Sequence, residues 1–249
     1  MLSQKAPTTP PKSSPSKKDA KKDVKDKDEK EKDAVQLSEE DLLLQSQLHD
    51  SVSILVDPTS SSDIRMSALT RISTEVQSAT GSMTSVPKPL KFLKPKHPTL
   101  VAYFKTLQPS DAVHRPLASL LSALSMTMDT TANLLSYRLI ARSASLTKEP
   151  VDLWGHEYVR SLTGAVGSEW STRIESFKPT VDLRPIVDDM VTYYLTKSGE
   201  SAAVDLLVET CGVGGLAKAL EGKDVENVGR LTLYLIKTSE YVGEEEVRV

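Results

Sequence analysis

The sequence has little of several residue types, and each shortage excludes a class of protein. Its 249 residues include a single cysteine, Cys211, which excludes an internal disulfide and a zinc site built from cysteines. Aromatic residues make up only 5% and glycines number 11, which argues against a β-sandwich or barrel. No apolar run approaches the roughly 20 residues that span a bilayer, so we expect no membrane partner. We also expect no secretory signal, because the first residues contain no hydrophobic core.

A strong excess of charge of either sign is also missing. The net charge is −3, so no overall basic field draws the chain to nucleic acid or to anionic lipid. The N-terminal residues contain no arginine and are rich in acids through Asp33, which disfavours a mitochondrial presequence. We therefore expect a protein of the cytoplasm and nucleus.

What is present divides the chain into two parts. Residues 1–33 hold 10 lysines and 7 acids with almost no apolar residue, whereas the remainder carries 21 basic and 27 acidic residues. Ordering the first part would cost roughly 1–2 kcal/mol per residue with no burial in return. We expect residues 1–36 to form a disordered charged tail and residues 37–249 to form an all-α domain. The lysine runs could act as a nuclear localisation signal or a nucleic-acid arm, although the interspersed acids favour a solvated linker.

From Ser38 onward the apolar residues recur at helical spacing. Ser38 opens a start that resembles a capping box, and the Asp57-Pro58 pair ends the first helix. We expect Ser110-Asp111 and Asp129 to cap two later helices. The stripes are Leu44, Leu48, Val52, Leu55; Ile64, Ala68, Ile72, Val76; Leu117, Leu120, Leu121, Leu124, Met128; Leu134, Leu135, Leu139; Trp154, Tyr158, Leu162, Val166, Trp170 in a helix over Val151–Trp170; Ile186, Met190, Tyr194; Val204, Leu207, Val208, Cys211; and Val228, Leu231, Leu235.

The breaks between these stripes set the architecture. Four prolines between Thr80 and Pro98 exclude a regular helix there, while Pro116 marks either a first turn or a kink. Gly199, Gly212 and Gly222 are candidate C-caps. We predict an all-α fold of eight to ten helices with no convincing strand. Short connections favour antiparallel helical hairpins in an irregular α-solenoid-like bundle.

No motif for catalysis or for metal binding is complete. His156-Glu157 begins an H-E-x-x-H motif, but Arg160 occupies the place of the second histidine. The glycine-rich residues 211–215 lack the frame of a phosphate-binding loop, and Cys211 lies on a core stripe. Trp154 and Trp170 are best interpreted as core anchors. We predict no catalytic residue, no cofactor and no metal, so the chain is not expected to be an enzyme.

One segment, Ser82–Pro95 with the sequence SMTSVPKPLKFLKP, combines proline bracing with lysines and interleaved apolar residues. It has two interpretations. It could be a rigid linker whose apolar residues pack onto neighbouring helices, or a docking surface with a basic rim. On the second interpretation the candidate partner contacts are Lys88, Lys91, Phe92 and Lys94.

The same segment carries a family resemblance. SMTSVPKPLKFLKP resembles a signature of the large non-ATPase scaffold subunit in the base of the 26S proteasome regulatory particle, called non-ATPase subunit 1 in one nomenclature and regulatory subunit 2 in another. The resemblance runs from about Ser38 to Tyr241. Further matching motifs follow in the same order: LSMTM (Leu124–Met128), YRL (Tyr137–Leu139), WGHEYVRSL (Trp154–Leu162), EW (Glu169-Trp170), VDLLVE (Val204–Glu209) and LYL (Leu233–Leu235).

This resemblance implies a non-catalytic scaffold that supports ubiquitin-dependent protein degradation through protein–protein contacts. The implied partners are the base ATPase subunits and other regulatory-particle subunits. In the family, ubiquitin, ubiquitin-like receptors and a deubiquitinase bind a toroid of helical repeats further downstream, and the sequence reaches Val249 before any such repeat. We therefore expect an N-terminal portion without those sites. The alternative is a helical adaptor that binds nucleic acid or chromatin through the lysine-rich tail.

Overall fold

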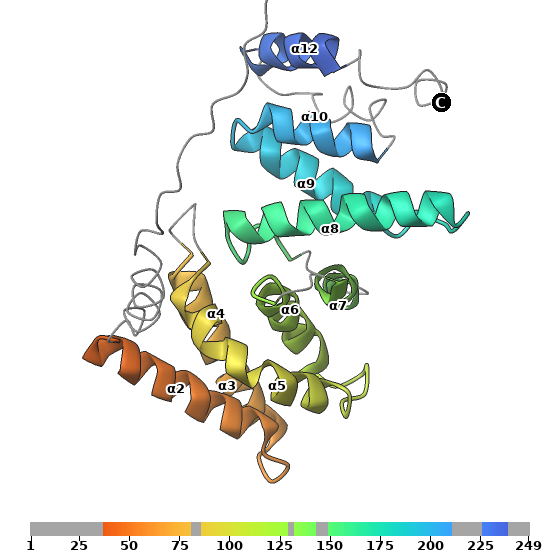
Figure 1. The fold of residues 1–249 in the computed structure, drawn as a ribbon. Coiled ribbons are helices and arrows are strands. Elements are labelled where there is room, and N and C mark those ends of the chain that lie inside the picture. Colours follow the sequence, from red (N-terminus) through yellow and green to blue (C-terminus); the bar gives the residue numbers. More distant parts are fainter. Residues whose placement is uncertain (1–36, 81–85, 129–131, 143–148, 211–225, 239–249) are drawn as a thin grey trace, which may run out of the picture. The chain divides into compact units, whose positions relative to one another are not determined.

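The computed structural model describes residues 37–80, 86–128, 132–142, 149–210 and 226–238. By its contacts the chain divides into two units, Met1–Leu42 and Leu43–Val249. The predicted tail, residues 1–36, lies outside the described residues. Within the described ranges the regular structure is helical and contains no strand, which confirms the all-α, solenoid-like prediction (Figure 1).

The described helices follow one another along the chain. A single turn of 3₁₀ helix, Lys94–Lys96, joins two of them. None of the described helices combines the length and apolarity that a membrane span requires. The α-helices are α2 (Glu39–Val56), α3 (Ser62–Ser78), α4 (Lys88–Leu93), α5 (His97–Phe104), α6 (His114–Ser125), α7 (Ala132–Arg142), α8 (His156–Glu175), α9 (Arg184–Thr196), α10 (Glu200–Glu209) and α12 (Glu226–Thr238).

The first two helices begin at caps that the sequence encodes. The Ser38 hydroxyl accepts a hydrogen bond from the Asp41 amide at 3.1 Å, as the predicted cap requires. Ser61 does the same for the Ile64 amide at the start of α3. Ile64, the first member of the second predicted stripe, is 52% exposed, whereas Leu69, outside the stripe, is buried. A spacing of four drifts about 40° per step around a helix, which carries the first member of the stripe away from the core.

The proline-rich stretch is more helical than predicted. Its prolines do exclude one continuous helix, but Pro89, Pro95 and Pro98 lie in the first two positions of α4, of the 3₁₀ turn and of α5. A proline is tolerated there because the missing N–H has no acceptor within the helix. The prolines therefore divide the stretch into short helices, which bury Leu90, Leu93 and Leu100.

Helix α6 lies at the centre of the described helices and contacts α3, α4, α5 and α7. It begins at His114, later than the predicted Ser110-Asp111 cap, and Pro116 lies in its first turn rather than at a kink. Asp111 instead closes a turn before the helix, where its carboxylate accepts from the Val113 amide at 3.0 Å. The predicted cap Asp129 of α7 lies outside the described residues.

Helix α8 also begins later than predicted. Trp154 lies in a turn before the helix, yet it is only 2% exposed. Gly155, at φ +88°, separates the two, and a Cβ there would meet the Thr80 Cβ at 3.0 Å. Only glycine can adopt this positive φ and leave room for Thr80 without strain. From this start α8 contacts α7, α9 and α10 (Figure 1).

The α9–α10 connection corrects one predicted cap. The left-handed residue is Ser198, at φ +56°, and not Gly199. The Gly199 amide follows it and donates to the Tyr194 carbonyl at 2.8 Å, which closes the end of α9. Gly212, Gly222 and the glycine-rich residues 211–215, including Cys211, lie outside the described residues.

Candidate docking surface

The predicted partner contacts lie on a row of lysines along α4 and the 3₁₀ turn. Lys88, Lys91 and Lys94 are exposed and three residues apart, so they follow one side of the helical segment. Leu90 and Leu93 on the other side are fully buried. The buried leucines agree with the first interpretation, in which apolar residues pack onto neighbouring helices, while the exposed lysines leave the second interpretation a prediction. We call Lys88, Lys91 and Lys94 the basic row.

Phe92 is less available than the lysines. Its ring is half-buried and packs against the core, and its carbonyl oxygen lies 3.0 Å from His49 Nε2 of α2. This contact links α4 to α2. The structure does not test whether a partner binds these four residues, and their role stays a prediction.

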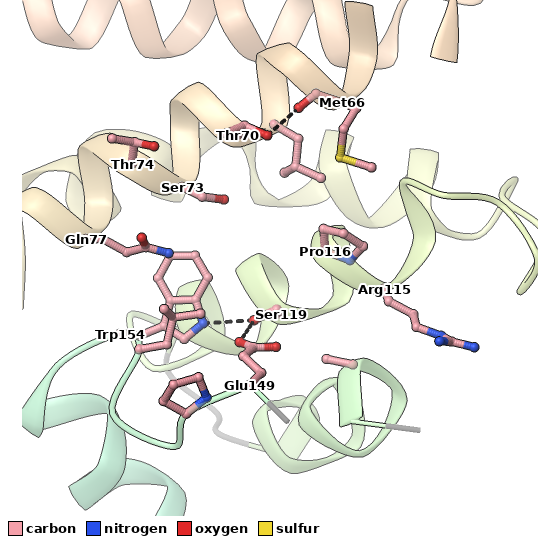
Figure 2. A pocket seen from close by; sticks show the side chains of 14 residues that line it. Met66, Thr70, Ser73, Thr74, Gln77, Arg115, Pro116, Ser119, Glu149 and Trp154 are labelled. Atoms are coloured by element: carbon pink, nitrogen blue, oxygen red, sulfur yellow. Dashed lines mark hydrogen bonds between the residues drawn. The ribbon is translucent and has the colours of Figure 1, made fainter. Parts of the chain in front are cut away.

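A groove of about 530 Å³ lies between α3, α6 and the residues that lead into α8 (Figure 2). Ser119 is at its centre: the hydroxyl accepts from Trp154 Nε1 at 2.9 Å and donates to the Glu149 carboxylate. Arg115 extends away from that carboxylate (Figure 2). The acidic group of the groove is thus already engaged by neighbours, and the arrangement supports packing rather than acid–base chemistry.

A buried arginine, Arg138, holds the segment that contains Glu149 against α7. Arg138 is 1% exposed, forms an ion pair with Glu149 at 3.1 Å, and donates to the Glu149 and Pro150 carbonyls at 3.0 and 3.3 Å. Burying a guanidinium is unfavourable unless it is paired, so these contacts tie the segment before α8 to α7. Sequence reasoning missed this role. The available signal was an arginine one turn after the buried Leu134 and Leu135.

Tyr158 lies deeper in the same interior. Its hydroxyl is 2.8 Å from the Ser122 hydroxyl, and Ser122 donates to the Leu134 carbonyl at 2.7 Å. Burial raises the pKa of Tyr158 to about 12, although nearby Arg138 opposes the shift. The phenol therefore stays protonated near neutral pH, where it serves as a hydrogen-bonding core residue.

The groups that could have formed an active site point to different surroundings. His156 Nδ1 lies 3.0 Å from the Tyr193 hydroxyl, and Glu157 makes a loose surface pair with Arg160 at 3.9 Å. Tyr158 instead faces Ser122, so His156, Glu157 and Tyr158 each have a different partner. Within the ranges described, no cluster of three or more histidine, cysteine or acidic residues could hold a metal ion.

Comparison with known proteins gives the family. The family model described as "RPN1 N-terminal domain" matches residues 48–248. The chain is 37% identical over 201 residues to the 26S proteasome regulatory subunit rpn1 of Schizosaccharomyces pombe, covering 80% of this chain and 21% of that protein. It is likewise 37% identical over 189 residues to the 26S proteasome non-ATPase regulatory subunit 2 of Dictyostelium discoideum, covering 75% and 20%.

A plant relative extends the match. Identity to the 26S proteasome non-ATPase regulatory subunit 2 homolog A of Arabidopsis thaliana is 37% over 214 residues, covering 85% of this chain and 23% of the relative. The chain thus spans about a fifth of the length of the curated relatives it matches. These findings confirm the resemblance inferred from the motifs: the chain belongs to the RPN1 N-terminal domain family.

Proposed function

We propose that this chain provides the N-terminal part of a non-catalytic scaffold in the 26S proteasome regulatory particle. It would support ubiquitin-dependent protein degradation through contacts with other subunits, in the cytoplasm and nucleus. The observation that carries the proposal is the family match across residues 48–248, with relatives that are named as proteasome regulatory subunits.

The basic row is the surface through which we expect the chain to contact another subunit. Its lysines are exposed along α4 and the 3₁₀ turn that follows, and the buried Leu90 and Leu93 anchor α4 in the core. A row of like charges on a rigid support attracts an acidic partner and sets its orientation, mainly through the association rate. We propose that this partner is an acidic surface on the base ATPase subunits. Ubiquitin, ubiquitin-like receptors and a deubiquitinase would bind elsewhere in the longer relatives.

The test is a binding measurement with purified base ATPase subunits at low and moderate salt. We expect the triple variant Lys88→Glu, Lys91→Glu, Lys94→Glu to bind at least tenfold more weakly at low salt. The difference should shrink as salt rises, because exposed charges are screened. A matched control reverses three exposed lysines elsewhere, Lys105, Lys197 and Lys237, and should bind like the unmodified chain. If the unmodified chain fails to bind even at low salt, the docking role is wrong.

The nucleic-acid alternative is tested separately. A salt-sensitive DNA-binding assay compares the full chain with a variant that lacks residues 1–33. We expect neither to bind DNA appreciably. Tight binding by the full chain, lost on the deletion, would favour the adaptor function instead.

A further inference from the structure

The last turn of α8 and the connection to α9 expose apolar side chains that are separate from the basic row. Phe177 is 98% exposed, Val181 78% and Ile174 53%. The other two phenylalanines differ: Phe104 is 9% exposed and Phe92 is half-buried. Isolated exposed leucines or isoleucines are ordinary, but a fully exposed aromatic ring with an exposed apolar residue on each side of it in the sequence is not.

The loop that carries Phe177 is held by a dense set of hydrogen bonds. Arg173 donates to Glu169 Oε1 at 2.7 Å, to the Pro179 carbonyl at 3.0 Å and to Asp182 Oδ1 at 2.6 Å. The Arg173 carbonyl in turn accepts from the Lys178 amide at 2.8 Å. Phe177 therefore lies between fixed points, and its exposure does not result from a loosely held loop.

The backbone conformation of Phe177 is also unfavourable. Its φ is +54°, in the left-handed region that bulky residues rarely adopt. Ser198, at φ +56°, ends α9 in the same region, but it is small and polar. Phe177 thus combines a strained backbone with an exposed ring, and strain of this kind concentrates at functional positions.

We propose that Phe177, flanked by Ile174 and Val181, inserts into an apolar pocket on a neighbouring protein subunit of the regulatory particle. The inference rests on the proposed function, which places the chain among other subunits. Aromatic side chains, phenylalanine among them, are enriched in the buried core of protein interfaces, where the partner removes them from water.

The charges around the ring favour a protein pocket over other occupants. Arg173 pairs with Glu169 and Asp182, and the exposed Glu175 and Lys178, within two residues of Phe177 in the sequence, are opposite in sign, so these five side chains sum to a net charge of −1. A nearly neutral rim lacks the clustered positive charge with which proteins bind nucleic acid or anionic lipid surfaces. The fitting partner is an aliphatic or aromatic pocket with a neutral edge.

The decisive variant is Phe177→Gly, with Ser198→Gly as its matched control. Both substitutions place glycine at a left-handed position, so neither should lower the melting temperature of the full chain. Binding to purified 26S regulatory particle should weaken at least tenfold for Phe177→Gly and stay unchanged for Ser198→Gly. Phe177→Trp should retain most of the binding. Unchanged binding by Phe177→Gly, or an equal loss in Ser198→Gly, would overturn the inference.

Photo-crosslinking identifies the occupant and separates this inference from the proposed function. A p-benzoylphenylalanine residue is introduced at position 177 or, in the basic row, at position 91. We expect position 177 to cross-link to a regulatory-particle subunit. Cross-links from position 91 alone would overturn the Phe177 inference and leave the proposed function standing. No association with the particle by any form of the chain would overturn both. Capture of a second copy of the chain, or binding to phosphatidylserine vesicles that Phe177→Gly abolishes, would overturn the assigned occupant.

Discussion

Helices α6 and α4 contact each other, yet they divide their side chains in opposite ways. Nearly every residue of α6 is buried, including its serines. Helix α4 buries Leu90 and Leu93 and exposes Lys88 and Lys91. This difference indicates which side chains can be changed without disturbing the fold. Packing constrains nearly all of α6, whereas the outer side of α4 is constrained only by what binds it.

The serines explain how α6 can be buried without a polar face. Each donates its hydroxyl within the interior, so none of the three serine hydroxyls is left without an acceptor. Their small side chains also allow neighbouring helices to approach closely. The acceptors are the Glu149 carboxylate for Ser119, the Leu134 carbonyl for Ser122 at 2.7 Å and the Leu121 carbonyl for Ser125 at 2.7 Å.

The largest expected effect comes from placing a charge inside α6. Leu121 is 0% exposed, so Leu121→Asp would bury a carboxylate with no partner and should destabilise the fold by about 5 kcal/mol or more. Circular dichroism during thermal unfolding measures this loss of stability. The matched control is Ile54→Asp on α2, where Ile54 is 44% exposed and the loss should stay below about 1 kcal/mol. Equal losses of stability in the two variants would show that α6 tolerates a charge no less than an exposed helix position does.

Removing the indole next to α6 should have the second largest effect. Trp154→Ala should cost about 3–5 kcal/mol, because Trp154 is 2% exposed and its loss leaves a cavity beside Ser119. Trp154→Phe keeps most of the volume and loses mainly the hydrogen bond to Ser119, worth about 1 kcal/mol. Urea denaturation of both variants measures the difference. A smaller loss for alanine than for phenylalanine would contradict the packing described for the groove.

The core helices were predictable because burial imposes a period on the sequence. Leu48, Val52 and Leu55 are buried as their spacing predicted, and so are Ile186 and Met190. The helix starts were less predictable. Trp154 fits the α8 stripe by number alone, but Gly155 adopts φ +88° and delays the helix, and only the contact with Thr80 explains why glycine is needed there.

The candidate surfaces were predictable to different degrees. The basic row follows from sequence because lysines next to buried leucines must face outward on a short helix. Phe177 did not, because its exposure depends on the left-handed turn and the Arg173 bonds that end α8. No local pattern distinguishes such a ring from a core phenylalanine. The pairing of Arg138 with Glu149 could not be predicted from the sequence either, because it joins residues from different segments.

An alkaline titration tests whether the Tyr158 phenol is buried in the folded state. Burial raises the pKa of Tyr158 to about 12, so the unfolded chain loses this proton first as pH rises above about 10. The native state binds the proton more tightly in that window, and the stabilisation from Tyr158 is lost as pH rises from about 10 to 12. A two-unit shift corresponds to about 3 kcal/mol. Denaturant melts of wild type and Tyr158→Phe should converge over this range. A constant difference would mean that the phenol is not buried.

The smallest expected effect lies on α4 and separates binding from folding most directly. Lys91 is exposed in the last turn of α4, where a cation interacts favourably with the helix C-terminus. Lys91→Glu should therefore cost only about 0.5 kcal/mol in a denaturant melt, while Lys91→Ala should cost less. The same Lys91→Glu chain should bind the base ATPase subunits more weakly at low salt. A loss of several kcal/mol would show that Lys91 is part of the packed structure, and weakened binding by this variant would then reflect unfolding. A small stability change with reduced, salt-dependent binding is the result expected if the outer side of α4 serves a partner rather than the fold.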